Sequence, residues 1–280
     1  MLRMFSALSA LVLALFAGPA LAAGAPKEPR HVAWGFDGPF GKHDPVQLQR
    51  GYKVYREVCA SCHSMSLMSY RNLGQKGGPF YDAKYPNPND SPYVKALAAE
   101  AQVNDIDSET GDVIQRPATS ADRFASPFPN EAAARASNGG SNPPDLSVMT
   151  KARHNGPSYV YSLLTGYVDP PAGLTVGPGQ YYNPYMPGDL TSAWTGQGHA
   201  PKGGFIAMPP PLTEDRVTYD DGTAASVDQM SKDVSAFMAW SAEPKMQERK
   251  AFGLGAMIYL LIFSIILWFS YRRVWRHVAH

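Results

Sequence analysis

Cysteine is almost absent from this chain, which has only two in 280 residues. Two cysteines cannot form the framework of several disulfides that holds small secreted domains together. They lie three positions apart, as Cys59 and Cys62, and a disulfide between them would close too small a loop to stabilise a domain of this size. The sequence therefore predicts that these two thiols serve chemistry rather than cross-linking.

Charge of one sign is also lacking, since 25 Lys and Arg residues face 24 Asp and Glu residues. The basic residues form no stripe of the kind that binds nucleic acid, so we expect no nucleic-acid partner. Acidic residues do gather locally, because eight lie between Asp82 and Asp122 beside only three basic residues. Such a run is usually a solvated face, but it could steer a basic protein partner. A second acidic group consists of Glu214, Asp215, Asp220 and Asp221.

The beginning of the chain has the layout of a secretory signal peptide. Arg3 precedes an uncharged apolar run from Phe5 to Phe16, and the small-residue pattern Ala20-Leu21-Ala22 follows. The apolar run is too short to span a bilayer, and a buried N-terminal helix is the less favoured alternative. We therefore expect residues 1–22 to be removed and residues 23–250 to form an exported domain.

A second apolar run near the other end is long enough to cross a membrane. Residues 251–271 contain no Asp, Glu, Lys or Arg, and about 20 apolar residues suffice for a spanning helix. Trp268 and Tyr271 lie where an aromatic belt would be, and arginines follow. Together with the signal peptide, this predicts a single-pass membrane protein. The exported domain would lie outside, with residues 272–280 in the cytoplasm.

The periodic segments of the exported part are helical, and no run alternates long enough to predict a substantial sheet. Asp44 and Pro45 are suited to begin a first helix, in which Gly51 would allow another helix to cross closely. Further helices are expected within residues 129–140, 157–167 and 225–243. Residues 74–123 and 168–212 are predicted to be mostly loop. The expected fold class is mainly α with long loops, plus one C-terminal transmembrane helix.

The two cysteines belong to the pattern Cys59-Ala-Ser-Cys62-His63, which is the attachment pattern for c-type haem. Two thiols at the end of a helix can each bind one vinyl group of a porphyrin, and the adjacent histidine can be an axial iron ligand. A thioredoxin-like redox pair would need a strand before the motif, whereas a helix precedes it here. A zinc site would need two more ligands, and there is no second cysteine pair.

The second axial ligand would decide what such an iron does. A methionine sulfur raises the potential and gives an electron carrier, whereas an open position gives ligand binding or catalysis. Met208 is the leading candidate because it lies in the proline-stiffened segment "IAMPPPL". Met186 in "NPYMPGD" is the main rival. Weaker candidates are Met65, Met68 and Met149, or His154 and His199 for bis-histidine ligation.

Several stretches together resemble the cytochrome c1 family, bacterial type. They include "QRGYKVYREVCASCHSM", "NPPDLSVMTKARHNGPSYVYSLLTGY", "YYNPYMPG" and "IAMPPPL", and they occur in the order that the family shows. The likeness covers nearly all of the chain after the signal peptide. It implies a class I cytochrome c-like domain with one covalently bound haem c, which is part of a bc1 complex in a respiratory chain.

The resemblance also implies roles for individual residues and partners. Cys59 and Cys62 would hold the haem, and His63 and Met208 would be its axial ligands. Pro144 would pack against the haem near His63, while Arg153 and Tyr159 would approach its edge, Arg153 pairing with a propionate. Electrons would pass from the Rieske iron–sulfur protein, beside cytochrome b, to a soluble or anchored cytochrome c. The chain would be an electron-transfer subunit of an oxidoreductase, with no catalysis of its own.

One segment departs from the compact versions of the family. Residues 189–205 lengthen the loop before Met208, and some bacterial members with insertions there add a disulfide that this chain cannot form. How this loop is held in place is left open by the sequence. Other functions also stay open: a free-standing membrane-anchored cytochrome, or a haem enzyme or sensor with an open iron position.

Overall fold

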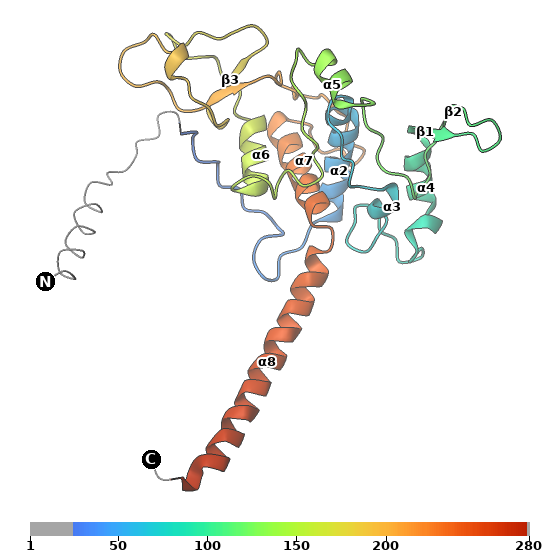
Figure 1. The fold of residues 1–280 in the computed structure, drawn as a ribbon, viewed down its shortest axis with the longest axis vertical. Coiled ribbons are helices and arrows are strands. Elements are labelled where there is room, and N and C mark those ends of the chain that lie inside the picture. Colours follow the sequence, from blue (N-terminus) through green and yellow to red (C-terminus); the bar gives the residue numbers. More distant parts are fainter. Residues whose placement is uncertain (1–24, 279–280) are drawn as a thin grey trace, which may run out of the picture. The chain divides into compact units, whose positions relative to one another are not determined.

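The computed structural model describes residues 25–278 and is mainly helical, as Figure 1 shows. The signal peptide predicted for residues 1–22 lies outside the described residues. The chain forms two compact units. Gly166–Pro209, with the described residues up to Glu28, form one, which we call the small unit. Pro29–Thr165 and the residues from Pro210 onward form the other, the large unit.

Two helices form the centre of the large unit. Helix α2 (Pro45–Glu57) begins as predicted, because the Asp44 carboxylate accepts a hydrogen bond from the Val46 amide at 3.0 Å. Helix α7 (Val227–Ala242) is capped by the side chain of Ser226. The predicted crossing at Gly51 is confirmed: a Cβ atom there would lie 2.1 Å from the carbonyl oxygen of Asp233 on α7.

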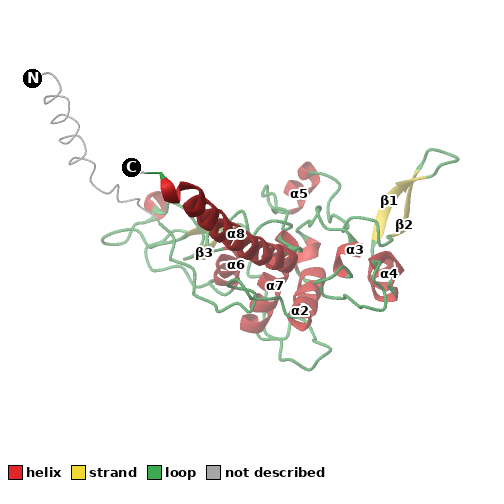
Figure 2. Ribbon diagram, turned by 90° about the horizontal axis from the view of Figure 1, so that it is seen from below, coloured by secondary structure: helices red, strands yellow, loops and turns green. Residues whose placement is uncertain are grey.

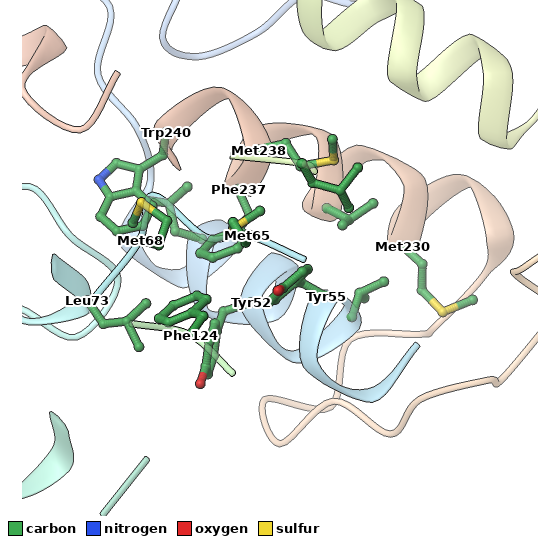
Figure 3. Packing of buried hydrophobic residues seen from close by; sticks show 14 of the residues in the cluster. Tyr52, Tyr55, Met65, Met68, Leu73, Phe124, Met230, Phe237, Met238 and Trp240 are labelled. Atoms are coloured by element: carbon green, nitrogen blue, oxygen red, sulfur yellow. The ribbon is translucent and has the colours of Figure 1, made fainter. Parts of the chain in front are cut away.

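The core of the large unit is aromatic where these helices meet. Phe237 of α7 packs against Tyr52 and Tyr55 of α2, with ring centroids 5.6 and 5.9 Å apart (Figure 3). Met65 and Met68, which follow the cysteine motif, are also buried in this core. The segment after the motif is therefore held by packing against the same two helices.

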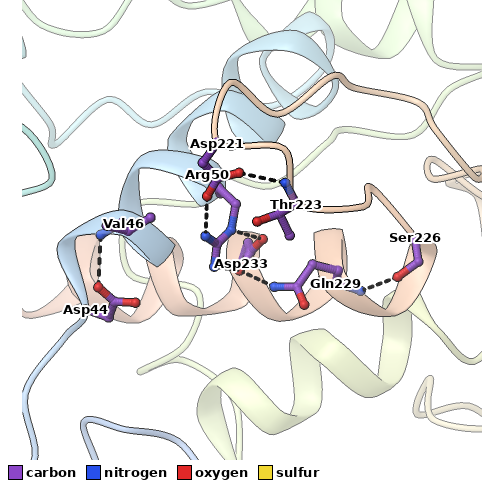
Figure 4. A network of polar contacts seen from close by, with 8 residues as sticks. All are labelled: Asp44, Val46, Arg50, Asp221, Thr223, Ser226, Gln229 and Asp233. Carbon is purple, nitrogen blue, oxygen red and sulfur yellow. Dashed lines mark hydrogen bonds and ion pairs between the residues drawn. The ribbon is translucent and has the colours of Figure 1, made fainter.

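A buried ion pair lies at the same crossing. Asp233 of α7 is fully buried and accepts hydrogen bonds from the Arg50 guanidinium at 2.9 Å and from the Gln229 amide at 2.9 Å (Figure 4). Arg50 also binds Asp221 at 2.8 Å. A buried carboxylate is costly unless it is paired, and here both sides of the crossing supply the partners.

Short elements surround these helices. They are η1 (Cys59–Ser61), α3 (Tyr70–Leu73), η2 (Pro88–Asp90), α4 (Pro92–Ala99), α5 (Glu131–Ser137) and α6 (Gly156–Leu164). Strands β1 (Gln102–Ile106) and β2 (Val113–Pro117) pair antiparallel in a hairpin that projects from the rest of the large unit (Figure 2). Residues 74–123 are mostly loop, as predicted, but they also contain α4 and this hairpin, which were not predicted from the sequence.

The small unit is mostly loop, as predicted for residues 168–212. It contains η3 (Thr191–Ala193) and an antiparallel pair of strands, β3 (Tyr181–Asn183) and β4 (Gly204–Ile206). Its own apolar core consists of Leu174, Tyr182 and Leu190, with partly buried residues that include Trp194 and Phe205.

Helix α8 (Met246–Val274), followed by η4 (Trp275–His277), contains the predicted span 251–271. Apolar residues cover this helix on all sides and are exposed, whereas a helix of a protein core would bury them. By its length and composition α8 can cross a membrane.

Candidate functional site

The cysteine motif forms a tight turn at the end of α2. The amides of Cys62 and His63 both donate to the carbonyl oxygen of Cys59, at 3.1 and 2.9 Å. This turn, η1, ends the helix and brings Cys62 and His63 back beside Cys59. The helix-then-turn order is the one expected for haem attachment, and within residues 25–58 no strand precedes the motif as it would in a thioredoxin-like site.

Both thiols are free and partly buried. Burial, with a smaller contribution from the neighbouring Cys62, raises the pKa of Cys59 to about 12. A reactive redox thiol needs a lowered pKa, which positive neighbours or an exposed helix N-terminus supply. The environment of Cys59 is therefore unsuited to disulfide exchange.

His63 is oriented by a backbone carbonyl. Its Nδ1 lies 2.8 Å from the carbonyl oxygen of Pro144, and because a carbonyl can only accept, Nδ1 carries the proton and donates it. The other ring nitrogen, Nε2, is then unprotonated and can bind a metal, and this arrangement is typical of metal-binding histidines. Burial lowers the pKa of His63, which also favours the neutral ring. The predicted proximity of Pro144 and His63 is thus present, through a hydrogen bond.

Asp145 is a part of the site that sequence reasoning missed. Its carboxylate accepts hydrogen bonds from the Ser64 hydroxyl at 2.8 Å, the Ser66 amide at 2.7 Å and the Ser147 amide at 2.8 Å. Burial opposes the charge, yet these hydrogen bonds hold the pKa of Asp145 at about 2. The carboxylate thereby joins the segment after His63 to the segment that contains Pro144, and it holds the two segments in place against each other.

Arg153 and Tyr159 are brought together in the large unit. Tyr159 lies on α6 and is buried, and Arg153 is exposed just before that helix. Burial raises the pKa of the Tyr159 hydroxyl, and the nearby Arg153 guanidinium acts against that increase. One Arg153 nitrogen also donates to the carbonyl of Ala152 at 3.1 Å.

Met208 belongs to the small unit, just after β4. Its side chain is partly buried, and its carbonyl oxygen accepts a hydrogen bond from the hydroxyl of Tyr167 at 3.0 Å. Tyr167 lies where the chain enters the small unit and Met208 where it leaves. The hydrogen bond therefore closes the base of the 166–209 segment. This hydrogen bond holds the two ends of the segment together in a chain that has no cysteine available for a disulfide there.

The rival ligands differ in their surroundings. Met65 and Met68 are buried in the main core, and His154 and His199 are exposed. Met186 is partly buried in the small unit, like Met208. Among residues 25–278 no group of three or more His, Cys, Asp or Glu side chains could hold a metal ion. The zinc alternative therefore finds no ligand set in the described part of the chain.

Comparison with known proteins gives a consistent answer. Residues 34–278 match the cytochrome C1 family. The chain is 46% identical over 241 residues to "Cytochrome c1 1, heme protein, mitochondrial" of Arabidopsis thaliana, covering 86% of this chain and 70% of that protein. It is 41% identical over 263 residues to "Cytochrome c1" of Rhodospirillum rubrum, covering 88% and 87%.

A third relative is longer than this chain. "Cytochrome b/c1" of Bradyrhizobium diazoefficiens is 44% identical over 261 residues, which are 86% of this chain and 35% of that protein. The present chain thus spans about a third of the length of that relative.

The chain belongs to the cytochrome c1 family.

In this cytochrome c1 family member, the donor atoms of Cys59, Cys62 and His63 fit the predicted covalent attachment of a haem. Two thiols lie in one turn at a helix end, and the adjacent imidazole has its Nε2 available because Nδ1 is used by Pro144. A pocket of about 200 Å³ elsewhere on α2, beside Arg50 and Lys53, contains none of the predicted site residues. That pocket is therefore separate from the attachment site, which is identified by the donor atoms of Cys59, Cys62 and His63.

Proposed function

We propose that this chain is the haem-bearing subunit of a bc1 complex and carries single electrons from a Rieske iron–sulfur protein to a c-type cytochrome. The observation that supports it best is the combination of family membership with the Cys59–His63 turn, in which Nε2 of His63 is free to bind iron. One haem c, bound through Cys59 and Cys62, would supply reversible one-electron chemistry. The residues of the chain would attach it, orient it and exclude water.

In this proposal His63 is the proximal ligand. Pro144 holds the imidazole in one tautomer and one orientation, and Asp145 holds the Pro144 segment against the motif. A histidine whose second nitrogen donates to a carbonyl is a stronger ligand than a free imidazole. His63 would therefore bind the iron firmly, with its ring held in one orientation.

Met208 is the proposed distal ligand. A thioether favours ferrous iron and raises the potential, as an electron carrier requires. Three prolines follow Met208, and Leu212 is buried in the main core, so the backbone beyond Met208 has little freedom. The Tyr167 hydrogen bond restrains the same backbone within the small unit. Met186 stays the alternative ligand.

Arg153 and Tyr159 are proposed to meet the haem edge. A guanidinium can form two parallel hydrogen bonds with a carboxylate, so Arg153 would pair with a haem propionate. Its exposed position beside Tyr159 leaves it accessible for such a pair. Tyr159 would add a hydroxyl from the rigid helix α6.

We propose that α8 anchors the protein in a bacterial inner membrane. Residues 23–250 would lie on the periplasmic side and residues 272–280 in the cytoplasm, following the signal peptide predicted at residues 1–22. Cytochrome b and the Rieske protein would be the partners within the complex. A free-standing anchored cytochrome is the second candidate, and purification without a cytochrome b would favour it.

Covalent haem attachment is tested by haem staining of the full chain after denaturation. The wild type should keep the stain, the double variant Cys59→Ser/Cys62→Ser should lose it, and each single variant should keep it only weakly. Stain that disappears from the denatured wild type would contradict covalent binding. Electron transfer is then tested by reduction of the purified complex with a quinol and a soluble cytochrome c.

A further inference from the structure

The loop before α2 presents an exposed phenylalanine. Its shape is set by two backbone hydrogen bonds, from Asp37 to Trp34 and from Lys42 to Gly35, both at 3.0 Å. Within this loop Phe40 is 75% exposed. A single exposed apolar side chain is common on protein surfaces, so what Phe40 does depends on where its loop lies relative to α8.

The loop is tied to the first turns of α8. The Lys250 ammonium donates to the carbonyl oxygens of Phe36 at 2.7 Å and Gly41 at 3.2 Å. Met246 of α8 packs with Phe36 in one small apolar cluster. In Figure 1 the blue loop before α2 runs beside the beginning of α8. Phe40 comes directly before Gly41 in the sequence, so it lies next to a residue whose carbonyl oxygen accepts a hydrogen bond from Lys250 of α8.

The loop binds α8 at the point where the charged first turns of the helix are followed by its apolar residues. Lys250 immediately precedes the apolar residues 251–271, and Phe252 is already 80% exposed. The polar headgroup layers add about 5–8 Å on each side of a hydrocarbon core that is about 30 Å thick. A residue next to Gly41 lies within that depth when α8 spans the bilayer.

We propose that Phe40 inserts into the membrane interface and gives the large unit a second lipid contact beside α8. This inference rests on the proposed membrane anchoring by α8. A single helix leaves an attached domain free to tilt, whereas a second contact fixes the side of the domain that faces the membrane. Phenylalanine is among the apolar residues that membrane-surface segments bury at the boundary between headgroups and acyl chains.

The test uses the photoreactive amino acid p-benzoylphenylalanine in place of Phe40 in the full chain in native membranes. Two control positions carry the same amino acid. Phe263, in the middle of α8, reports on lipid contact of the anchor. Val113, on the hairpin, is 73% exposed, nearly as much as Phe40. After irradiation, mass spectrometry of the labelled peptides measures phospholipid adducts at each position.

We expect phospholipid adducts at positions 40 and 263, at several times the yield at position 113. Adducts at 263 with position 40 no better than 113 would overturn the inference and leave the anchor intact. Cross-links from position 40 to a neighbouring polypeptide alone would overturn it too, because the contact would then be a subunit. A lack of lipid adducts at both 40 and 263 would overturn the anchor, and this inference with it.

Discussion

At the scale of single residues, the site depends on hydrogen bonds that fix atoms next to the proposed iron ligands. Pro144 orients His63, and Tyr167 holds the backbone of Met208. Neither partner is a ligand itself. Both act on the backbone or tautomer of a ligand, so their removal should change how firmly the ligand is held and leave the haem attached.

Removing the Tyr167 hydroxyl should loosen Met208. A typical hydrogen bond contributes about 1 kcal/mol, which corresponds to about fivefold in an equilibrium. We expect Tyr167→Phe to let imidazole displace the sulfur from ferric haem about fivefold more readily, measured by loss of the near-infrared sulfur–iron band. Tyr182→Phe is the matched control, because it removes a tyrosine–carbonyl hydrogen bond, to Lys202 at 2.6 Å, elsewhere in the small unit. Equal effects in both variants would contradict a specific role for Tyr167.

Asp145 should make stability depend on pH in the acid range. Its pKa of about 2 lies below the ordinary value of 3.8, so the folded state favours the charged form. The stabilisation is complete above about pH 5 and is lost progressively as the pH falls from about 5 to about 1. Allowing for solvent screening, it amounts to about 1–2 kcal/mol. Urea unfolding should show Asp145→Asn weakened by that amount at pH 7, with most of the difference from wild type gone near pH 2.

The exposed Asp37→Asn is the control for that experiment. A loss of stability in Asp145→Asn that stayed the same from pH 7 to pH 2 would mean that the charge of Asp145 is not what stabilises the segment.

These supporting residues show which parts of the site the sequence alone cannot predict. Cys59, Cys62 and His63 could be predicted because their spacing within five residues is itself the signal. Asp145 and Tyr167 could not, since each acts on residues 41 or more positions away, and a lone Asp or Tyr has many ordinary uses. Only folding brings them to the ligands.

At the scale of elements, α2 and α7 determine where the motif lies. The end of α2 leads directly into the cysteine turn, and α7 packs across α2 at Gly51. The buried pair of Arg50 and Asp233 joins the two helices a few ångströms from that crossing. Their close approach therefore sets the position of the motif relative to the core.

The substitution Gly51→Ala should destabilise the large unit. The added Cβ atom would lie 2.1 Å from a backbone oxygen of α7, which cannot move without shifting the helix. Overpacking of this kind costs about 1–3 kcal/mol. Circular dichroism should show a lower melting temperature. Gly253→Ala, on α8 with nothing within 4 Å of the added atom, should leave it unchanged. A Gly51→Ala variant as stable as wild type would refute the close crossing.

The long helices were predictable because their caps and apolar spacing agree. Asp44, Asn130 and Ser226 each cap a helix through the side chain. The hairpin of β1 and β2 was missed for a physical reason. Most of its residues are exposed, and its apolar residues do not alternate with polar ones, so it lacks the pattern that marks a half-buried strand.

At the scale of the whole molecule, the acidic residues fall into two kinds. Asp220 and Asp221 form ion pairs with Lys53 and Arg50 of α2. Glu109 and Asp112, at the tip of the hairpin, are exposed and form no ion pair within residues 25–278. Unlike Asp220 and Asp221, the two hairpin acids therefore present uncompensated charge to a basic partner.

Neutralising the hairpin tip should slow electron transfer to a basic cytochrome c. We expect Glu109→Gln/Asp112→Asn to lower the second-order rate constant about two- to fivefold at low ionic strength, because exposed charges act mainly on association. The difference should vanish at high salt. Asp220→Asn/Asp221→Asn removes the same charge and serves as the comparison. If that variant slowed the reaction more, the hairpin would not be the steering surface.

The division into two units was not predictable from the sequence. The prolines and glycines of residues 168–212 predicted loops, and loops they largely are, but their own small core of Leu174, Tyr182 and Leu190 emerges only on folding. The family and the attachment motif, in contrast, were predictable because they rest on residue identity and order.

The proposed electron-transfer function depends most on Met208 as the second iron ligand. The most direct test is the optical spectrum of the detergent-solubilised full chain, with and without carbon monoxide, for wild type and Met208→Leu. We predict a low-spin wild type that shows the sulfur–iron band when oxidised and does not bind carbon monoxide. Met208→Leu should lose the band, bind carbon monoxide and fall in potential. A wild type that binds carbon monoxide, or a Met208→Leu variant that keeps the band, would contradict the account.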